Sequence, residues 1–287
     1  MSGVVTVRRF VHGDLAAAAR FCDAARALDA CIEPFGQRLA AIATGSRAAL
    51  EFWRVAGGED GALYGVALAA FRESAGGALY DFYAAVHPSL RRQGLGRALS
   101  EPALGSGVNL RARVRDDARP GRAFASALGF VETGAQLSLQ WSGGQVEARP
   151  MSGLRIRRAA RRDEQVLQKL SEDAWAGAPD IIASRPDEIE QLFTEEDRLV
   201  LLAESANRAL GYLSAVPLGR TLGIEEVAVL PEFRRRGIAR TLLAHALAQA
   251  KAAVLSVSES NIPGRALYRA LGFRQTARRL VLELRRR

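Results

Sequence analysis

The feature of this 287-residue chain that most restricts its fold is an internal repeat. Residues 86–96 read VHPSLRRQGLG and residues 229–239 read VLPEFRRRGIA, at an offset of 143 residues (234 − 91 and 237 − 94). The same offset carries residues 120–130, PGRAFASALGF, onto residues 263–273, PGRALYRALGF. Unrelated loops would not keep one register over this distance without a gap. We therefore interpret the chain as two copies of one domain.

The length and composition agree with two domains. A chain of 287 residues is long for one domain and comfortable for two. We place the copies at residues 1–144 and 152–287, because glycine, proline and charged residues cluster in Ser142–Gly153. A hydrophobic share of 48% and a charged share of 25% predict a buried core and a soluble chain.

The sequence carries no targeting or disulfide signal. No apolar run approaches the length that spans a bilayer, and the first residues lack the apolar segment of a signal peptide. Cys22 and Cys31 suggest neither a disulfide framework nor a metal site. We therefore expect a cytoplasmic protein that holds no metal and does not engage membranes.

The positive charge of the chain indicates an anionic ligand. The formal net charge is +9, and arginine supplies nearly all of the basic residues, because Lys169 and Lys251 are the only lysines. This charge fits a nucleotide-like ligand and a nucleic acid equally well.

Each copy predicts the same succession of elements: a strand, one or two helices, a central meander, a strand followed by a basic turn and a helix, another strand, a short helix and a closing strand. Strands and helices in this order favour an α/β (α+β) fold with a mixed, mostly antiparallel sheet flanked by helices. The central strands are expected at Leu50–Val55, Leu63–Phe71 and Leu79–Val86 in the first copy and at Arg198–Glu204, Ala209–Pro217 and Gly223–Leu230 in the second.

The basic turn of the second copy has the composition of a phosphate site. The apolar residues 227–230 form a short strand that Pro231 ends, and an arginine-rich turn with Gly237 leads straight into a helix. At a helix N-terminus, unpaired backbone N–H groups converge and the helix dipole adds positive charge. A basic helix start with a packing glycine is the alternative interpretation of the turn taken alone.

Two linked motifs resemble the GNAT superfamily of N-acetyltransferases. Arg234-x-x-Gly237-x-Ala239 is similar to the family's acyl-CoA pyrophosphate loop, Q/R-x-x-G-x-G/A. Residues 261–273 are similar to its N…A-x-x-L-Y-x-x-x-G-F signature, in the right order and at a normal distance. The resemblance covers nearly the whole chain twice, in a layout like that of the mycothiol synthase branch. It implies direct transfer of an acyl group, most simply from acetyl-CoA, to a primary amine of a small molecule or peptide.

The resemblance also implies roles for individual residues of the second copy. Tyr268 would protonate the leaving thiolate, because the pKa of a phenol lies close to that of an alkyl thiol. Glu225 would act as the base, directly or through water, with Glu226 as the alternative and a solvated pair at a strand start as another. Tyr268 could instead be an amphipathic core residue, and Asn261 could be a helix cap. The residues expected to hold the cofactor are Val227, Val229, Arg234, Arg235, Arg236, Gly237, Ile238, Ala239, Arg240 and Asn261.

The first copy keeps the loop but lacks the other groups. Its complete loop, with the candidate residues Arg91, Arg92, Gln93, Gly94, Leu95 and Gly96, could still bind CoA. Gapless alignment puts Ala125 at the place of Tyr268, Ala118 at the place of Asn261 and Phe82 at the place of Glu225. Pro102 falls inside the helix after the loop, where it should cost about 3 kcal/mol and bend or end that helix. We therefore expect a non-catalytic first copy.

Two other functions remain as alternatives. A CoA-binding sensor or scaffold without turnover would keep the loops and need no acid or base. A nucleic-acid-binding module rests on charge alone, and no aromatic residues for base stacking accompany the basic turns. The acceptor stays open among sugar amines, aminoglycosides, peptides, polyamines and mycothiol precursors. The two copies suggest a pseudo-dimeric monomer, with a homo-oligomer as the other possibility.

Overall fold

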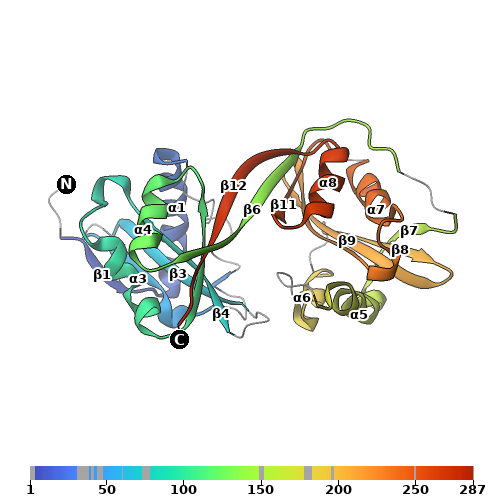
Figure 1. Cartoon of the computed structure of the whole chain (residues 1–287). Coiled ribbons are helices and arrows are strands. Elements are labelled where there is room, and N and C mark those ends of the chain that lie inside the picture. Colours follow the sequence, from blue (N-terminus) through green and yellow to red (C-terminus); the bar gives the residue numbers. More distant parts are fainter. Residues whose placement is uncertain are drawn as a thin grey trace. The chain divides into compact units, whose positions relative to one another are not determined.

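The computed structural model describes residues 4–30, 39, 42–43, 48–59, 61–72, 78–148, 152–177, 183–194, 197–248 and 250–286. The chain forms two compact units (Figure 1). Unit 1 consists of Met1–Gly134 and Arg279–Arg287, and unit 2 consists of Ala135–Arg278. Cys31 lies outside the described residues, and Cys22 is a buried free thiol. No helix in the described part of the chain is long and apolar enough to cross a membrane.

The sheet of unit 1 has the strand order β1-β2-β3-β4-β5-β12-β6. Strands β1 to β4 pair antiparallel, β4 and β5 pair parallel, and β5 and β12 pair antiparallel. Its elements are β1 (Thr6–Arg9), α1 (Leu15–Leu28), β2 (Arg54–Gly57), β3 (Leu63–Arg72), β4 (Leu79–Val86), α3 (Leu95–Gly105), β5 (Asn109–Arg115), α4 (Arg119–Ala127) and the start of β6 (Val131–Trp141).

Unit 2 repeats this arrangement with the strand order β12-β6-β11-β10-β9-β8-β7. Strands β7 to β10 pair antiparallel, β10 and β11 pair parallel, and β11 and β6 pair antiparallel. Its elements are β7 (Arg155–Arg158), α5 (Glu164–Trp175), α6 (Pro186–Gln191), β8 (Leu199–Ser205), β9 (Arg208–Leu218), β10 (Thr221–Val229), α7 (Ile238–Leu247), β11 (Ala253–Ser258), α8 (Ile262–Ala270) and the start of β12 (Arg274–Leu284).

The last strand of each copy crosses into the other unit (Figure 1). Strand β6 leaves unit 1, and its residues 136–141 pair with β11 in unit 2. Strand β12 leaves unit 2, and its residues 279–284 pair with β5 in unit 1. The boundaries 1–144 and 152–287 describe the sequence repeat and stay a prediction. The compact units differ from these copies because each unit contains part of the other copy's last strand.

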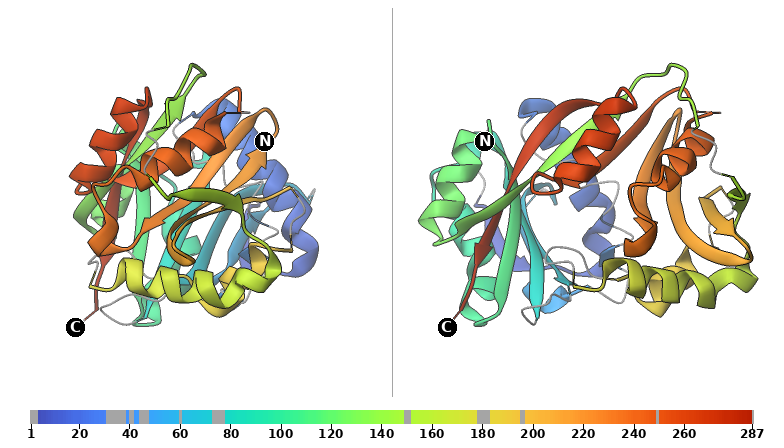
Figure 2. Two further views of the ribbon diagram at one scale, coloured as in Figure 1. Left: turned by 90° about the vertical axis from the view of Figure 1, so that its right-hand side faces the viewer. Right: turned by 45° about the vertical axis from the view of Figure 1, so that its right-hand side comes forward.

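Helices cover both faces of each sheet (Figure 2). In unit 1, α1 packs on one face through Phe21 and Cys22, and α3 and α4 pack on the other through Leu99 and Ala125. In unit 2, one core joins α5 to β8–β10, and a second core joins α7 and α8 to the opposite face. The apolar spacing after Gly237 predicts one buried helix face, and the members within α7 are buried, namely Ile238, Leu242, Leu243, Ala246 and Leu247. Ala250, the last member of that spacing, lies beyond the end of α7 and is half-buried.

One local prediction was wrong, and a second was wrong in part. The strand expected at Leu50–Val55 is a 3-10 turn, Leu50–Phe52, followed by β2. The turn is held because the Trp53 indole N–H donates to the Ala69 carbonyl at 2.6 Å. Pro102 does not end α3, which continues to Gly105. The helix persists because Leu99 and Ala103, on either side of the proline, are buried in the core.

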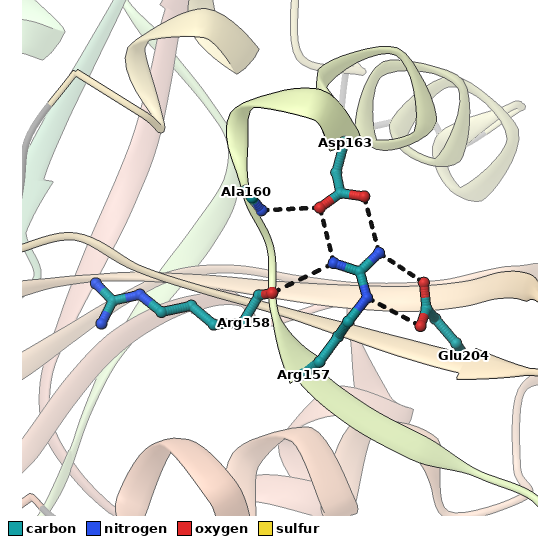
Figure 3. A network of polar contacts seen from close by, with 5 residues as sticks. All are labelled: Arg157, Arg158, Ala160, Asp163 and Glu204. Carbon is teal, nitrogen blue, oxygen red and sulfur yellow. Dashed lines mark hydrogen bonds and ion pairs between the residues drawn. The ribbon is translucent and has the colours of Figure 1, made fainter.

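An arginine fork ties the first strand of each unit to the following helix. In unit 2 the Arg157 guanidinium donates to Asp163 Oδ2 at 2.7 Å and to Glu204 Oε1 at 2.7 Å (Figure 3). Asp163 also accepts the Ala160 N–H at 2.8 Å. The hydrogen bond from Arg157 outweighs burial and lowers the pKa of Asp163 to about 2. Arg8 makes the same paired contact with Asp14 in unit 1, so this device also repeats.

We expect Asp163→Asn to lower the free energy of unfolding by about 2 kcal/mol at pH 7. A carboxyl whose pKa is lowered by folding stabilises above its unfolded pKa, near 4, and loses that effect as the pH falls toward 2. The gap between wild type and variant should therefore close between pH 4 and pH 2 in denaturant titrations. Asp173→Asn is the control, because its exposed pair with Lys169 should contribute under about 0.5 kcal/mol. A gap independent of pH would contradict this role for the Asp163 charge.

Candidate functional site

Strands β10 and β11 diverge after a short parallel ladder. They pair only at residues 222–224 and 253–255, although β10 runs on to Val229. The Leu230 N–H donates to Leu210 on β9 at 3.0 Å. Since main-chain direction alternates along a strand, the N–H and C=O groups of Val227 and Val229 point to the side that β11 leaves unpaired. Unit 1 shows the same ladder, which joins residues 79–81 only to 109–111.

The turn after β10 presents free amides. Arg235 and Gly237 both have positive φ, 63° and 88°, and Gly237 is the residue from which α7 starts. The first helical bond of α7 runs from the Thr241 N–H to the Gly237 carbonyl at 3.0 Å. The N–H groups of residues 238–240 therefore have no acceptor within the helix. The turn in unit 1 has the same backbone, with φ of 65° at Arg92 and 81° at Gly94.

The first arginine of each turn is a brace. Arg234 donates from Nε to the Val229 carbonyl at 3.1 Å and from Nη2 to the Ala174 carbonyl at 2.5 Å. Arg91 donates to the Val86 carbonyl at 3.2 Å and pairs with Asp29 at 2.8 Å. Each guanidinium thus ties the strand end to the helix that precedes the meander.

The other predicted side chains of the turn lie as follows. The Arg236 guanidinium lies over the Phe233 ring, 5.2 Å from its centroid. Arg240 donates from Nε to the Glu147 carbonyl at 3.1 Å. Ile238 is buried and Ala239 is half-buried, both against the core that α7 and α8 share.

Tyr268 joins the same core. Its ring packs edge-on against Phe273, with 5.7 Å between centroids, in a cluster that also contains Val227, Val229 and Ala239. Burial raises the pKa of the Tyr268 hydroxyl to about 12, so the group stays protonated at neutral pH. Asn261 caps α8, because its Oδ1 accepts the Gly264 N–H at 2.9 Å. A helix cap was the alternative that the sequence analysis gave to cofactor binding by Asn261.

The two adjacent glutamates are separated by a β-bulge. The register of β10 against β9 shifts between Ile224 and Glu226, which makes Glu225 the extra residue. The carboxylate of Glu225 pairs with Arg198 and is 46% exposed. The bulge also explains why Ile224 and Glu226, two residues apart, face different cores.

Glu226 is the centre of a buried polar group that sequence reasoning missed. Trp175 Nε1 donates to its Oε1 at 2.6 Å, and Ser184 Oγ donates to its Oε2 at 3.3 Å. Burial raises the pKa of Glu226, while the hydrogen bonds from Trp175 and Ser184 act in the opposite direction. No local pattern signals this group, because Trp175 lies 51 residues away along the chain.

Unit 1 differs at the matching positions. Ala118 has nearly the backbone angles of Asn261 but makes no side-chain cap. Its β4 has no bulge, and Phe82 turns into the core, where it stacks on Phe130 with 6.3 Å between centroids. The Phe124 ring lies against the loop: a Cβ added at Gly96 would meet it at 3.1 Å. The Phe124 ring thus lies beside the unit 1 turn.

Comparisons with known proteins identify the family. A family model described as "Acetyltransferase (GNAT) family" matches residues 166–273, which include the turn, Glu225 and Tyr268. Residues 166–273 therefore resemble a GNAT acetyltransferase domain. No curated protein sequence matches it significantly.

Solved GNAT structures share the fold along the whole chain. A GCN5-related N-acetyltransferase from Sphaerobacter thermophilus has 20% identity and a TM-score of 0.75, over 98% of this chain and 95% of that one. A tandem GNAT protein from the clavulanic acid biosynthesis pathway has 17% identity and a TM-score of 0.75, over 98% of both chains. A putative acetyltransferase from Pyrococcus horikoshii has 13% identity and a TM-score of 0.68, over 100% and 91%. The α/β fold with tandem GNAT architecture is confirmed, and the family match supports N-acetyltransferase activity.

Proposed function

We propose that unit 2 transfers an acetyl group from acetyl-CoA directly to a primary amine of a small molecule or peptide. One observation carries this proposal. A single core brings together the parted strand β10, the start of α7 and Tyr268, within the segment that matches the GNAT family. No cysteine lies on these elements, so they offer no thiol that could form a covalent acyl-enzyme intermediate. The amine therefore attacks the thioester directly in a ternary complex.

In this proposal the main chain does most of the cofactor binding. The amides of Val227 and Val229 bind the pantetheine arm, and the N–H groups of residues 235–240 bind the pyrophosphate. The guanidinium of Arg234 contributes indirectly by bracing the turn, as Arg91 does in unit 1. The Tyr268 hydroxyl, held neutral, donates its proton to the leaving thiolate.

We propose Glu225 as the base, acting through water, and Glu226 as a structural carboxylate. The half-exposed carboxylate of Glu225 lies on the bulge of β10, where water can reach it. The carboxylate of Glu226 already accepts bonds from Trp175 and Ser184, which ties β10 to the segment between α5 and α6. Its oxygens are therefore engaged in holding the fold.

The test measures free CoA released from acetyl-CoA with and without a panel of primary amines. Amine-dependent release supports transferase activity, whereas binding of CoA without release for any amine supports the sensor. In the same assay we expect Glu225→Gln to lower kcat about 10–100-fold at an unchanged melting temperature. Glu226→Gln should instead keep most of the activity. A larger loss of kcat in a folded Glu226→Gln protein would transfer the role of base to Glu226.

A further inference from the structure

Three arginines surround one aspartate on the sheet of unit 1. Asp81 lies on the central strand β4 and accepts hydrogen bonds from both neighbouring strands. Arg72 on β3 donates to its Oδ2 at 3.0 Å. Arg111 and Arg113 on β5 donate to its Oδ1 at 2.9 and 3.2 Å. We call these four residues the arginine cluster.

The arginine cluster has more donors than its carboxylate can satisfy. Each guanidinium carries five N–H donors, and a carboxylate offers about four acceptor sites. The Arg111 side chain is only 14% exposed, and its Nη2 has no hydrogen-bond partner among the described residues. Glu283 lies opposite Arg111 in the β12–β5 pairing, and its carboxylate is paired with Arg285 at 2.8 Å. A buried, charged donor without an acceptor is costly, which favours an anion beside it.

The pKa of Asp81 reflects the three positive charges around it. Burial alone would raise the pKa of its carboxyl, yet the positive charges of Arg113, Arg72 and Arg111 lower it to about 2. Asp81 is therefore ionised at any physiological pH, and three guanidinium groups share this one carboxylate.

The position of the arginine cluster in the fold is specific. Asp81 and Arg111 form the last rung of the short β4–β5 ladder, and Arg113 lies on β5 beyond the point where the two strands part. Both arginines face away from Leu110 and Ala112, which are in the core under α3. The arginine cluster thus occupies the sheet face opposite α3, where the two strands diverge.

The fold itself does not require these charges. In unit 2, Val254 and Ser256 of β11 stand at the positions of Arg111 and Arg113, at the offset of 143 residues (254 − 111 and 256 − 113). Both face away from the buried Leu255, as the arginines face away from Leu110. Unit 2 forms the same ladder without a charged cluster, so stability alone does not account for the arginines.

We propose that the arginine cluster binds the oxyanion group, phosphate or carboxylate, of a small molecule in unit 1. In this site the ligand competes with Asp81 for the guanidinium groups and accepts from donors that Asp81 leaves unsatisfied, such as Arg111 Nη2. Planar guanidinium forks suit both oxyanions, which they bind through paired, charge-assisted hydrogen bonds. The proposal is independent of the acetyl transfer assigned to unit 2.

The experiment uses the full chain with both phosphate turns blocked by Gly94→Glu and Gly237→Glu, so that only other anion sites report. Calorimetric titrations with inorganic phosphate and with succinate, at constant ionic strength, should show saturable binding of at least one probe. Their relative affinities identify the preferred oxyanion. Arg113→Gln, and separately Arg72→Gln at the rim, should weaken that binding about tenfold or more. Arg115→Gln is the matched control on the same strand and face, since Arg115 is paired with Asp117, and it should change nothing.

Asp81→Asn separates binding from a purely structural role. It removes the competing carboxylate, so the folded variant should bind the anion more tightly than the parent. The proposal is overturned if neither probe binds the parent chain. It is equally overturned if the Arg113→Gln and Arg72→Gln proteins, folded by their melting temperatures, bind as tightly as Arg115→Gln.

Discussion

Tyr268→Phe should lower kcat by about 10²–10⁴-fold while leaving the affinity for CoA nearly unchanged. The substitution removes one hydroxyl and keeps the ring that packs against Phe273. Because burial raises the pKa of this hydroxyl to about 12, the wild-type group stays protonated from acid to mildly alkaline pH. The wild-type rate should therefore show no decline from deprotonation of Tyr268 below about pH 11.

The measurement is steady-state kcat at saturating amine, beside a calorimetric Kd for CoA. Tyr80→Phe in unit 1 is the matched control, because it removes a hydroxyl from the same fold without touching the segment that matches the family. A pre-steady-state assay must first show that chemistry, not product release, limits turnover. If chemistry limits and the Tyr268→Phe rate equals that of wild type, then water or another group protonates the thiolate.

The sequence predicted the local elements of the fold well, because their patterns are local. Residues 79–86 and 253–258 form the strands that their apolar patterns indicate. The helix after the basic turn begins at Ile238, directly after the glycine that takes positive φ. These features depend on alternation, on turn residues and on a glycine, and all three can be read from neighbouring residues.

The exchange of the last strands could not be predicted in the same way. Residues 137–141 and 281–284 have the same alternating pattern, so either strand could complete either sheet. Only the direction of the chain after residues 130 and 273 decides which sheet each strand joins. That direction depends on tertiary packing, which no pattern within the strand records.

The site was predictable in its main chain more than in its side chains. The turn lies where the motif placed it, but the Arg234 guanidinium, expected to hold the cofactor, donates back to the Val229 carbonyl. Glu225 is the single extra residue of a bulge in β10, and β4 of the first copy has no such bulge. Phe82 of the first copy therefore faces the core, as Ile224 of the second copy does. Contacts such as Trp175 with Glu226 join residues far apart in sequence and therefore leave no local signal.

The proposed division of function between the two units predicts the second large effect. Gly237→Glu should abolish turnover, because it forces a side chain onto a backbone with φ of 88° and puts a negative charge where the pyrophosphate is proposed to bind. The matching Gly94→Glu change, at φ of 81°, should leave kcat nearly untouched. The two substitutions impose the same strain and the same charge, so each controls for the other.

The reason for the asymmetry lies in what stands beside each turn. In unit 1, Ala125 has no proton to donate, Ala118 has no polar side chain, and the Phe124 ring packs against the start of α3 at Gly96. CoA can therefore bind in unit 1 weakly or unproductively. If both turns of the parent chain bind CoA, titrations that count bound CoA per chain should show one site fewer in each variant. If the Gly94→Glu protein stays folded and loses activity, unit 1 must be an active or coupled site, and catalysis by unit 2 alone would be wrong.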